Sequence, residues 1–246
     1  MSNETLYIHE TIQISVRHRK EYLDHFCSWD STTRRLYDMR CLGVWATVGS
    51  TDMWPEAIVM WELDGLDALT RMLSGEFAFL QSENAEIPDH YELFWGGAPE
   101  GVTATSGYDR VLLPHAQSPT LESALESGVS GIGYYHEFAR VRPGRAPEFL
   151  ELYDARWRPF LEGLGMRLVG SYRTLLKNDS ETLAVWALPE WSCWAALERA
   201  LATAPEARDW RERCAPFELD WDAKLLTPAA NSPLDAARRA LDFCSH

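Results

Sequence analysis

Several features that identify common classes of protein are missing from this sequence of 246 residues. No apolar run reaches the ~18 residues expected of a membrane-spanning helix. The N-terminus lacks the basic segment followed by an apolar one that marks a secretion signal. The five cysteines form no C-x-x-C pair, which is typical of reduced thiols inside the cell. These absences predict a soluble, cytoplasmic protein.

Positive charge is also scarce. Lys and Arg number 23 against 37 Asp and Glu, so the formal net charge is −14. Nucleic acids and anionic membrane surfaces both attract proteins with excess positive charge. We therefore expect neither a nucleic-acid partner nor a membrane partner. The apolar content of 46 %, with 11 Trp, 9 Tyr and 9 Phe, is ample for a folded core.

Signatures of metal and cofactor binding are absent too. The sequence has no H-x-x-x-H pair and no Cys/His cluster, and His9 and Glu10 are neighbours on a predicted strand, so they point to opposite faces. It also lacks a glycine-rich phosphate loop and the G-x-S-x-G motif. We expect no metal site and no cofactor.

The sequence contains one pattern twice. Tyr7-Ile8-His9-Glu10 opens the first copy, and Tyr134-Tyr135-His136-Glu137 opens the second 127 residues later. Further matches are Leu42-Gly43 with Val169-Gly170, Trp45 with Tyr172, 58–63 with 183–188, and 108–113 with 221–226. Solenoids need at least three repeats. A long repeat that occurs only twice indicates a duplicated domain whose copies pack on each other.

The hydrophobic period changes in the same order within each copy. It predicts β-α-β-β-α-β over 6–16, 19–40, 44–48, 56–63, 67–79 and 110–113, and again over 134–141, 146–164, 168–176, 182–188, 192–203 and 221–226. This order is the ferredoxin-like unit, whose two helices cover one face of an antiparallel sheet. The other face of each sheet is apolar and must be buried against the other copy. We therefore predict an α+β fold in which two tandem ferredoxin-like repeats pack sheet-to-sheet as a pseudo-dimeric α+β barrel.

The predicted domains follow from this order. The first repeat covers 1–115, a linker with a short helix at 121–126 covers 116–130, and the second repeat covers 131–228. A C-terminal helical tail covers 229–246, with Ser232 as N-cap and Pro233 at the first helical position. The oligomeric state stays open, homo-oligomers included.

His9 and His136 are the first candidate catalytic residues. Histidine titrates nearest to physiological pH, so it is the commonest proton-transfer group. Both share a strand face with a tyrosine, Tyr7 or Tyr134, and we expect these tyrosines to contact substrate if that face lines the barrel. The alternative is that both histidines lie at the barrel mouth and only bond to the backbone.

Glu10 and Glu137 are the second pair of candidates. Each is the acidic member of an otherwise apolar strand face. A buried carboxylate must be paired or have a raised pKa, and a raised pKa suits a general acid or base. The alternative is that each glutamate forms a structural ion pair with an arginine at the sheet edge.

Aromatic residues on the central strands are candidate substrate-binding residues. Trp45, Trp61, Tyr172 and Trp186 lie at matching positions of the two copies. Aromatic walls suit a flat, apolar substrate, although ordinary core packing explains the same pattern. We expect a small apolar or aromatic molecule as the partner of this protein.

Short motifs resemble one known family. Val141-Arg142-Pro143-Gly144 joins a strand to a helix, and Val16-Arg17-His18-Arg19 is its degraded counterpart. With the paired tryptophan strands and a last strand reading Leu-Leu-x-Pro, the chain resembles the NIPSNAP-type branch of the dimeric α+β barrel superfamily, in tandem form. The resemblance implies the barrel fold and, for members of the superfamily, isomerase, cyclase, lyase or cofactorless oxygenase chemistry.

Haem proteins such as the chlorite dismutase-like group belong to the same superfamily. They take an axial histidine from the helical region of the second copy. Here the second copy offers His136, which lies on a predicted strand, and the terminal His246. The resemblance therefore makes haem the least favoured reading.

Our leading hypothesis is a cofactor-independent enzyme that uses His/Glu acid–base chemistry on an apolar or aromatic substrate inside the barrel. A non-catalytic ligand-binding or protein-interaction role of the NIPSNAP type is the alternative. The copies differ near the candidate histidines, with Thr11 against Phe138 and Gln13 against Arg140. We expect the first copy to be catalytic and the second to shape binding.

Overall fold

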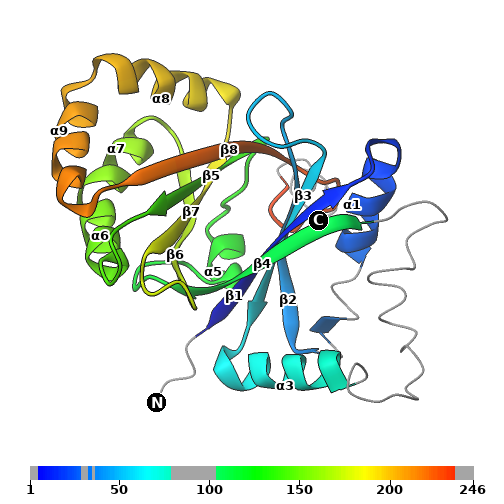
Figure 1. Ribbon diagram of the computed structural model, residues 1–246. Coiled ribbons are helices and arrows are strands. Elements are labelled where there is room, and N and C mark those ends of the chain that lie inside the picture. Colours follow the sequence, from blue (N-terminus) through cyan, green and yellow to red (C-terminus); the bar gives the residue numbers. More distant parts are fainter. Residues whose placement is uncertain (1–4, 29–32, 35–36, 79–103, 236–246) are drawn as a thin grey trace.

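The computed structural model describes residues 5–28, 33–34, 37–78 and 104–235, and they form a closed, fully antiparallel barrel with helices on its outside (Figure 1). The strands are β1 (Leu6–Ile14), β2 (Met39–Thr47), β3 (Glu56–Leu63), β4 (Ala104–Pro114), β5 (Gly133–Arg140), β6 (Arg167–Thr174), β7 (Glu181–Leu188) and β8 (Asp220–Pro228).

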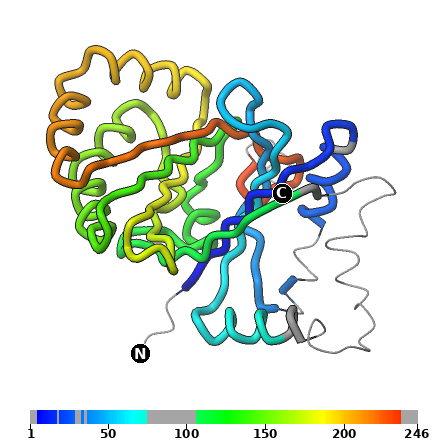
Figure 2. The backbone as a smooth tube through the Cα atoms, viewed as in Figure 1, coloured from blue at the N-terminus to red at the C-terminus, as the bar shows by residue number. Residues whose placement is uncertain are grey.

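The helices fall into two groups, one for each copy, on opposite sides of the strands (Figures 1 and 2). Those of the first copy are α1 (Arg19–Ser28), which follows the 3₁₀ turn η1 (Val16–His18), and α3 (Gly65–Ala78). The linker carries α5 (Leu121–Glu126). The second copy has α6 (Ala146–Leu152), the π-helical turn η4 (Tyr153–Trp157), α7 (Arg158–Gly163), α8 (Trp191–Thr203), α9 (Pro205–Cys214) and the 3₁₀ turn η5 (Ala215–Phe217).

The strand order around the barrel is β1-β3-β2-β8-β5-β7-β6-β4. Each copy supplies four adjacent strands, and two junctions join the copies. β2 pairs with β8 through residues 45–47, and β4 pairs with β6 through residues 112–114. The predicted pseudo-dimeric α+β barrel is confirmed, with the two sheets also hydrogen-bonded edge to edge.

Side chains of each strand alternate between the inside of the barrel and the helices, as the pleat requires. On β1, Tyr7 belongs to the inner cluster, whereas Ile8 and Ile12 pack beneath the first copy's helices. On β5, Tyr134 lies inside and Tyr135 packs beneath the helices of the second copy. The described residues therefore form three cores, one inside the barrel and one under each helical layer.

One end of the barrel is closed by the segments that follow β4 and β8. Leu121 of α5 and Leu234 of the tail are both buried in the inner cluster. The carboxylate of Glu62 accepts hydrogen bonds from the Leu121 amide at 2.8 Å and from the Tyr7 hydroxyl at 2.7 Å. The linker helix predicted at 121–126 is confirmed, and it seals this end.

The tail is described as far as Asp235, and residues 236–246 of the predicted helical tail lie outside the described residues. The hydroxyl of Ser232 accepts the Val44 amide at 3.0 Å, which ties the tail to β2. Over its described part the tail forms turns.

Two element boundaries and one helix differ clearly from the sequence-based prediction. β2 begins at Met39, so the helix predicted to reach residue 40 is too long. β4 begins at Ala104 rather than at residue 110. α9 is absent from the prediction because its residues are mostly polar, although Pro205 at its first turn is a recognised helix-start signal. In the described part of the chain, no helix is long and apolar enough to cross a membrane.

Candidate functional site

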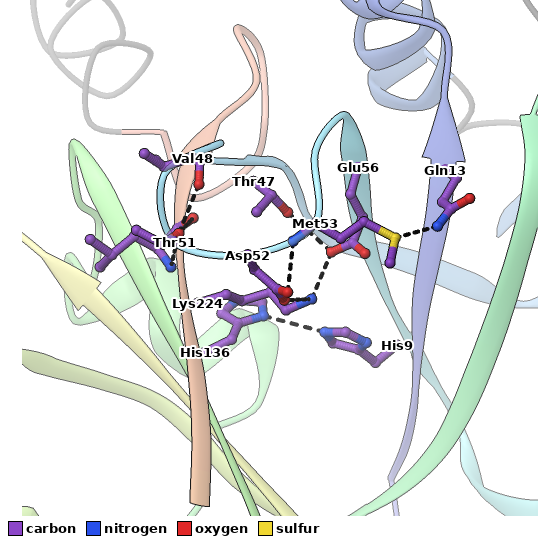
Figure 3. A network of polar contacts seen from close by, with 11 residues as sticks. His9, Gln13, Thr47, Val48, Thr51, Asp52, Met53, Glu56, His136 and Lys224 are labelled. Atoms are coloured by element: carbon purple, nitrogen blue, oxygen red, sulfur yellow. Dashed lines mark hydrogen bonds and ion pairs between the residues drawn. The ribbon is translucent and has the colours of Figure 1, made fainter.

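His9 on β1 and His136 on β5 meet inside the barrel. Nε2 of His9 lies 3.3 Å from Nδ1 of His136, and neither side chain is exposed to solvent. Figure 3 shows the two rings pointing toward each other from opposite strands. Because they occupy equivalent positions of the two copies, their contact lies at the pseudo-two-fold axis.

The surroundings keep both histidines neutral at pH 7. Burial lowers the pKa of each ring well below its usual 6.5. The charges of Arg110 and Lys224 add to this effect for His9, whereas His9 and Lys224 do so for His136. A neutral imidazole has one donor and one acceptor nitrogen, so the pair shares one hydrogen bond. Nδ1 of His9 and Nε2 of His136 are buried and have no hydrogen-bond partner among the described residues.

The open end of the barrel holds a pocket of about 560 Å³, within the range of small-molecule sites. Phe138 lines this pocket and also packs against His9, with its ring centroid 5.7 Å from that of His9. The pocket is lined by Thr11, Gln13, Asp52, Met53, Glu56, Ser106, Gly107, Tyr108, Arg110, Phe138, Arg140, Glu181, Asp220, Trp221, Asp222 and Lys224.

Three ion pairs at the pocket wall join one copy to the other. Nε of Arg110 lies 2.8 Å from Glu181 Oε1, and Nζ of Lys224 lies 2.7 Å from Glu56 Oε1. Lys224 also reaches Asp52 Oδ2 at 2.6 Å, on the loop between β2 and β3 that crosses toward β8 (Figure 3). Within the described chain, no three His, Cys, Asp or Glu side chains are grouped to hold a metal ion.

The strand registers show that Arg110 and Lys224 are equivalent residues. Arg110 is opposite His9, and Lys224 is opposite His136. The sequence alignment of 108–113 with 221–226 matches Arg110 to Ala223 and is wrong by one residue. A one-residue slip turns an inward side chain outward, which is why sequence reasoning misses both cations. A shared sequence pattern identifies them. Residues 110–114 and 224–228 both read basic residue, apolar residue, Leu, any residue, Pro.

Four of the predicted aromatic residues fill the half of the barrel below the histidines. Tyr7 packs against Tyr172 with ring centroids 4.9 Å apart, and Trp45 packs against Tyr134 at 5.2 Å. Trp45 also contacts the His136 ring at 5.1 Å. They support the histidine pair from the closed end and do not line the open pocket.

The remaining predicted site residues lie on the outer face of the barrel, so the structure does not bring them to the pocket. Trp61 belongs to the core beneath the first copy's helices, and Trp186 to the core of the second copy. Glu10 and Glu137 follow the histidines directly and therefore point the opposite way.

Glu137 is held by aromatic donors rather than by an arginine. Its Oε1 accepts the indole N–H of Trp157 at 3.1 Å and of Trp221 at 2.7 Å, and its Oε2 accepts the Tyr153 hydroxyl. Burial raises the pKa of this carboxyl, and the three hydrogen bonds oppose that shift. This arrangement makes Glu137 a structural centre of the second copy's outer core.

No protein-family model matches the chain, and no curated protein matches it. Solved structures do. The chain is similar to a "putative monooxygenase" from Lactobacillus acidophilus NCFM, with a TM-score of 0.58 and 11 % identity over 92 % of this chain and 95 % of that one. It is also similar to a "putative monooxygenase" from Fusobacterium nucleatum, with a TM-score of 0.55 and 9 % identity over 94 % of each chain.

A NIPSNAP domain protein from Burkholderia xenovorans is 25 % identical over 40 % of this chain and 95 % of that one, with a TM-score of 0.35. The structures similar to this chain thus include NIPSNAP domain proteins and members of the dimeric α+β barrel class. The likeness to the first two structures shows the fold, a ferredoxin-like α+β barrel.

Proposed function

We propose that this chain is a small-molecule enzyme that binds its substrate in the open end of the barrel and acts by proton transfer without a cofactor. The observation that carries the proposal is the histidine pair directly beneath the pocket. His9 and His136 contact each other at 3.3 Å, and the Phe138 ring, which lines the pocket, packs against the His9 ring.

The pair has the properties of a proton relay. When one imidazole donates to the other, one outer nitrogen is left as an acceptor and the other as a donor. A proton taken up at one end can thus be balanced by release at the other. Rotation of Phe138 would give a bound molecule access to His9. An isomerase, a lyase or cyclase, and a cofactorless oxygenase all need such a proton transfer.

The expected roles of the two copies follow from their pocket residues. The first copy presents Thr11 to the pocket where the second presents Phe138. A proton-transfer group needs polar neighbours to stabilise developing charge. His9 is therefore the proposed general base, and His136 is the residue that orients it.

Mass spectrometry of the freshly purified chain, native and then denatured, tests for a bound small molecule. The released molecule is returned to the protein in D₂O, and NMR follows exchange of its carbon-bound protons. We expect His9→Gln to slow this exchange by about 100-fold, as loss of a general base does. His136→Gln should act mainly on binding or stability. Glu10→Gln is the matched control, because its side chain faces away from the pocket.

A non-catalytic ligand-binding role is the second candidate. The observation that favours it is the complete burial of both histidines in a barrel whose inner half is filled by aromatic rings. In that case the released molecule would bind with unchanged affinity to His9→Gln, and no proton exchange would be seen with any variant.

A further inference from the structure

We propose that the pocket recognises a small carboxylate, which Arg110 and Thr11 hold at the pocket floor. This inference rests on the proposed function only in using the same pocket, and it names the class of ligand and the residues that determine specificity. Two polar atoms of the wall, Arg110 Nη1 and Thr11 Oγ1, are buried and have no hydrogen-bond partner among the described residues.

Arg110 is fixed in place with one donor group unused. Its Nε donates to Glu181 at 2.8 Å, its guanidinium also hydrogen-bonds to the Tyr108 side chain, and it lies 4.7 Å from the ring centroid of Phe138. Only 10 % of the side chain is exposed. Nη1 is buried without a hydrogen-bond partner among the described residues. Buried polar groups are nearly always hydrogen-bonded, so an orphaned guanidinium N–H points to a ligand.

Thr11 supplies a second donor on the same wall. It is 2 % exposed, lines the pocket, and has no described hydrogen-bond partner for its Oγ1. Thr11 lies two residues beyond His9 on β1, and Arg110 is opposite His9 on the neighbouring strand β4. The hydroxyl and the guanidinium therefore belong to one region of the inner wall. A planar carboxylate suits a guanidinium donor and a hydroxyl donor together.

The other cation of the pocket is already occupied. Lys224 donates to both Glu56 and Asp52. The position equivalent to Thr11 in the second copy is Phe138, which has no polar atom in its side chain. The unused donors are therefore concentrated on the first copy's wall, beside His9.

A simple count of charges argues for the opposite ligand, because acidic residues outnumber basic ones along the pocket. Three of these acids, Glu56, Glu181 and Asp52, are already in ion pairs with Lys224 or Arg110. The remaining acids, Asp220 and Asp222, are exposed at the rim, where water and salt screen the effect of their charges beyond about 10 Å. A buried donor without a partner at the floor therefore outweighs the charge of the rim.

The rest of the pocket suits a flat apolar body. Tyr108 and Trp221 are 53 % and 39 % exposed at the rim, and Phe138 forms the floor. Aromatic surfaces of this kind bind planar ligands. The proposed ligand is therefore an aromatic or similarly flat carboxylate.

Carboxylate binding at Arg110 should also change the pKa of His9. Burial and then the charge of Arg110 are the main causes that lower the pKa of this histidine. A carboxylate bound at Arg110 offsets part of that positive charge. Binding should therefore raise the pKa of His9 toward neutrality, which improves it as a general base.

Three probes with the same ring test the proposal on the full chain: benzoate, benzamide and benzylamine. Binding is measured by calorimetry and by NMR titration, which also follows the pKa of His9. We expect benzoate to bind at least 10-fold more tightly than benzylamine, and the pKa of His9 to rise when benzoate binds.

Arg110→Met should lower the affinity for benzoate at least 10-fold and change the affinity for benzamide by no more than about 3-fold. Thr11→Val, which keeps the side-chain shape, should weaken benzoate several-fold. Arg140→Met is the matched control, because Arg140 lines the same pocket but is 70 % exposed. If Arg110→Met unfolds the chain because it leaves Glu181 with only its longer contact to Arg140 at 3.9 Å, the double variant with Glu181→Gln replaces it.

Tighter binding of benzylamine, equal losses in Arg110→Met and Arg140→Met, or no benzoate binding at 10 mM would each overturn the proposal. The result is independent of the proton-transfer proposal. His9→Gln should still bind benzoate. Intact benzoate binding with no proton exchange of the co-purified molecule in the unchanged chain would contradict the enzyme function alone.

Discussion

The two buried histidines make the stability of the barrel depend on pH. In the folded chain the pKa of His9 and of His136 lies well below 6.5, whereas in the unfolded chain each is close to 6.5. Between these values the unfolded state binds more protons than the folded state. The free energy of unfolding should therefore fall as pH falls below about 6.5, by up to about 1.4 kcal/mol per pH unit for each histidine.

Replacing either histidine should flatten this dependence. Urea unfolding of His9→Gln and His136→Gln at pH 8, 7, 6 and 5.5 measures the slope directly, and comparison with the unchanged chain cancels the contribution of other groups. His25→Gln, at a partly exposed site on α1, is measured alongside as a histidine replaced outside the barrel. A double His9→Gln, His136→Gln variant with the original slope would contradict the assignment.

The sequence predicts part of this site at the residue scale. The repeat identifies His9 and His136 as equivalent candidate residues of the two copies, but their direct contact is seen only in the structure. It does not reveal Arg110 and Lys224, since a one-residue error in aligning the last strands moves them to the wrong face. Their pairing with Glu181 and Glu56 depends on contacts between the copies, which no local pattern records.

At the scale of elements, a glycine in each copy makes room for the aromatic residue two positions later. A Cβ atom on Gly43 would lie 2.2 Å from the Trp45 ring, and one on Gly170 would lie 2.1 Å from the Tyr172 hydroxyl oxygen. Both glycines follow an irregularity in the pairing of their strands, β2 with β3 and β6 with β7. Each buried aromatic ring therefore lies flat along its own strand.

Alanine at either glycine should destabilise the fold. Because the Trp45 and Tyr172 rings are fully buried and cannot move aside freely, Gly43→Ala and Gly170→Ala should each cost about 1–3 kcal/mol, typical of overpacking. Gly163→Ala is the control, since a Cβ there meets nothing within 4 Å. Chemical denaturation gives the three values. Equal stabilities for Gly43→Ala and Gly163→Ala would show that the Trp45 ring can shift to make room for the added methyl group.

The order of elements is predictable from the sequence, but the inward face of each strand is not. Strands buried on both faces are apolar throughout, so the hydrophobic pattern gives no sign of which face lines the barrel. The pattern therefore groups Trp61 and Trp186 with Trp45 and Tyr172, although they point to the helices. The π-helical turn at Tyr153–Trp157 is also beyond prediction, because Glu137, which accepts hydrogen bonds from both its end residues, lies on a distant strand.

For the whole molecule, removing one partner of an ion pair between the copies should destabilise the fold, whereas neutralising both partners together should have a much smaller effect. Lys224→Met leaves Glu56, which is 4 % exposed, without its cation, and breaking a buried pair in this way costs about 3–5 kcal/mol. Lys224→Met combined with Glu56→Gln should recover most of that loss. Arg213→Met breaks an exposed pair with Asp209 and should have little effect on stability, because water screens such a pair. Thermal and urea unfolding measure all three, and an equal loss in the single and double Lys224 variants would refute this account.

Neither copy should fold stably when it is separated from the other. Cutting the chain after Ser130 keeps α5 with the first copy, whose Glu62 binds the Leu121 amide. Each fragment alone would expose the apolar inner face of its sheet, so we expect weak folding or self-association.

Mixed fragments should form a one-to-one complex in preference to either homodimer. Thr11 of one copy and Phe138 of the other both face the pocket, so two first copies would leave a gap there and two second copies would crowd two phenylalanine rings. Gaps and overpacking both destabilise a core. Native mass spectrometry of the mixture, with light scattering of each fragment, measures the outcome. Stable monomers of either fragment, or homodimers that do not exchange on mixing, would show that the copies are independent domains rather than halves of one barrel.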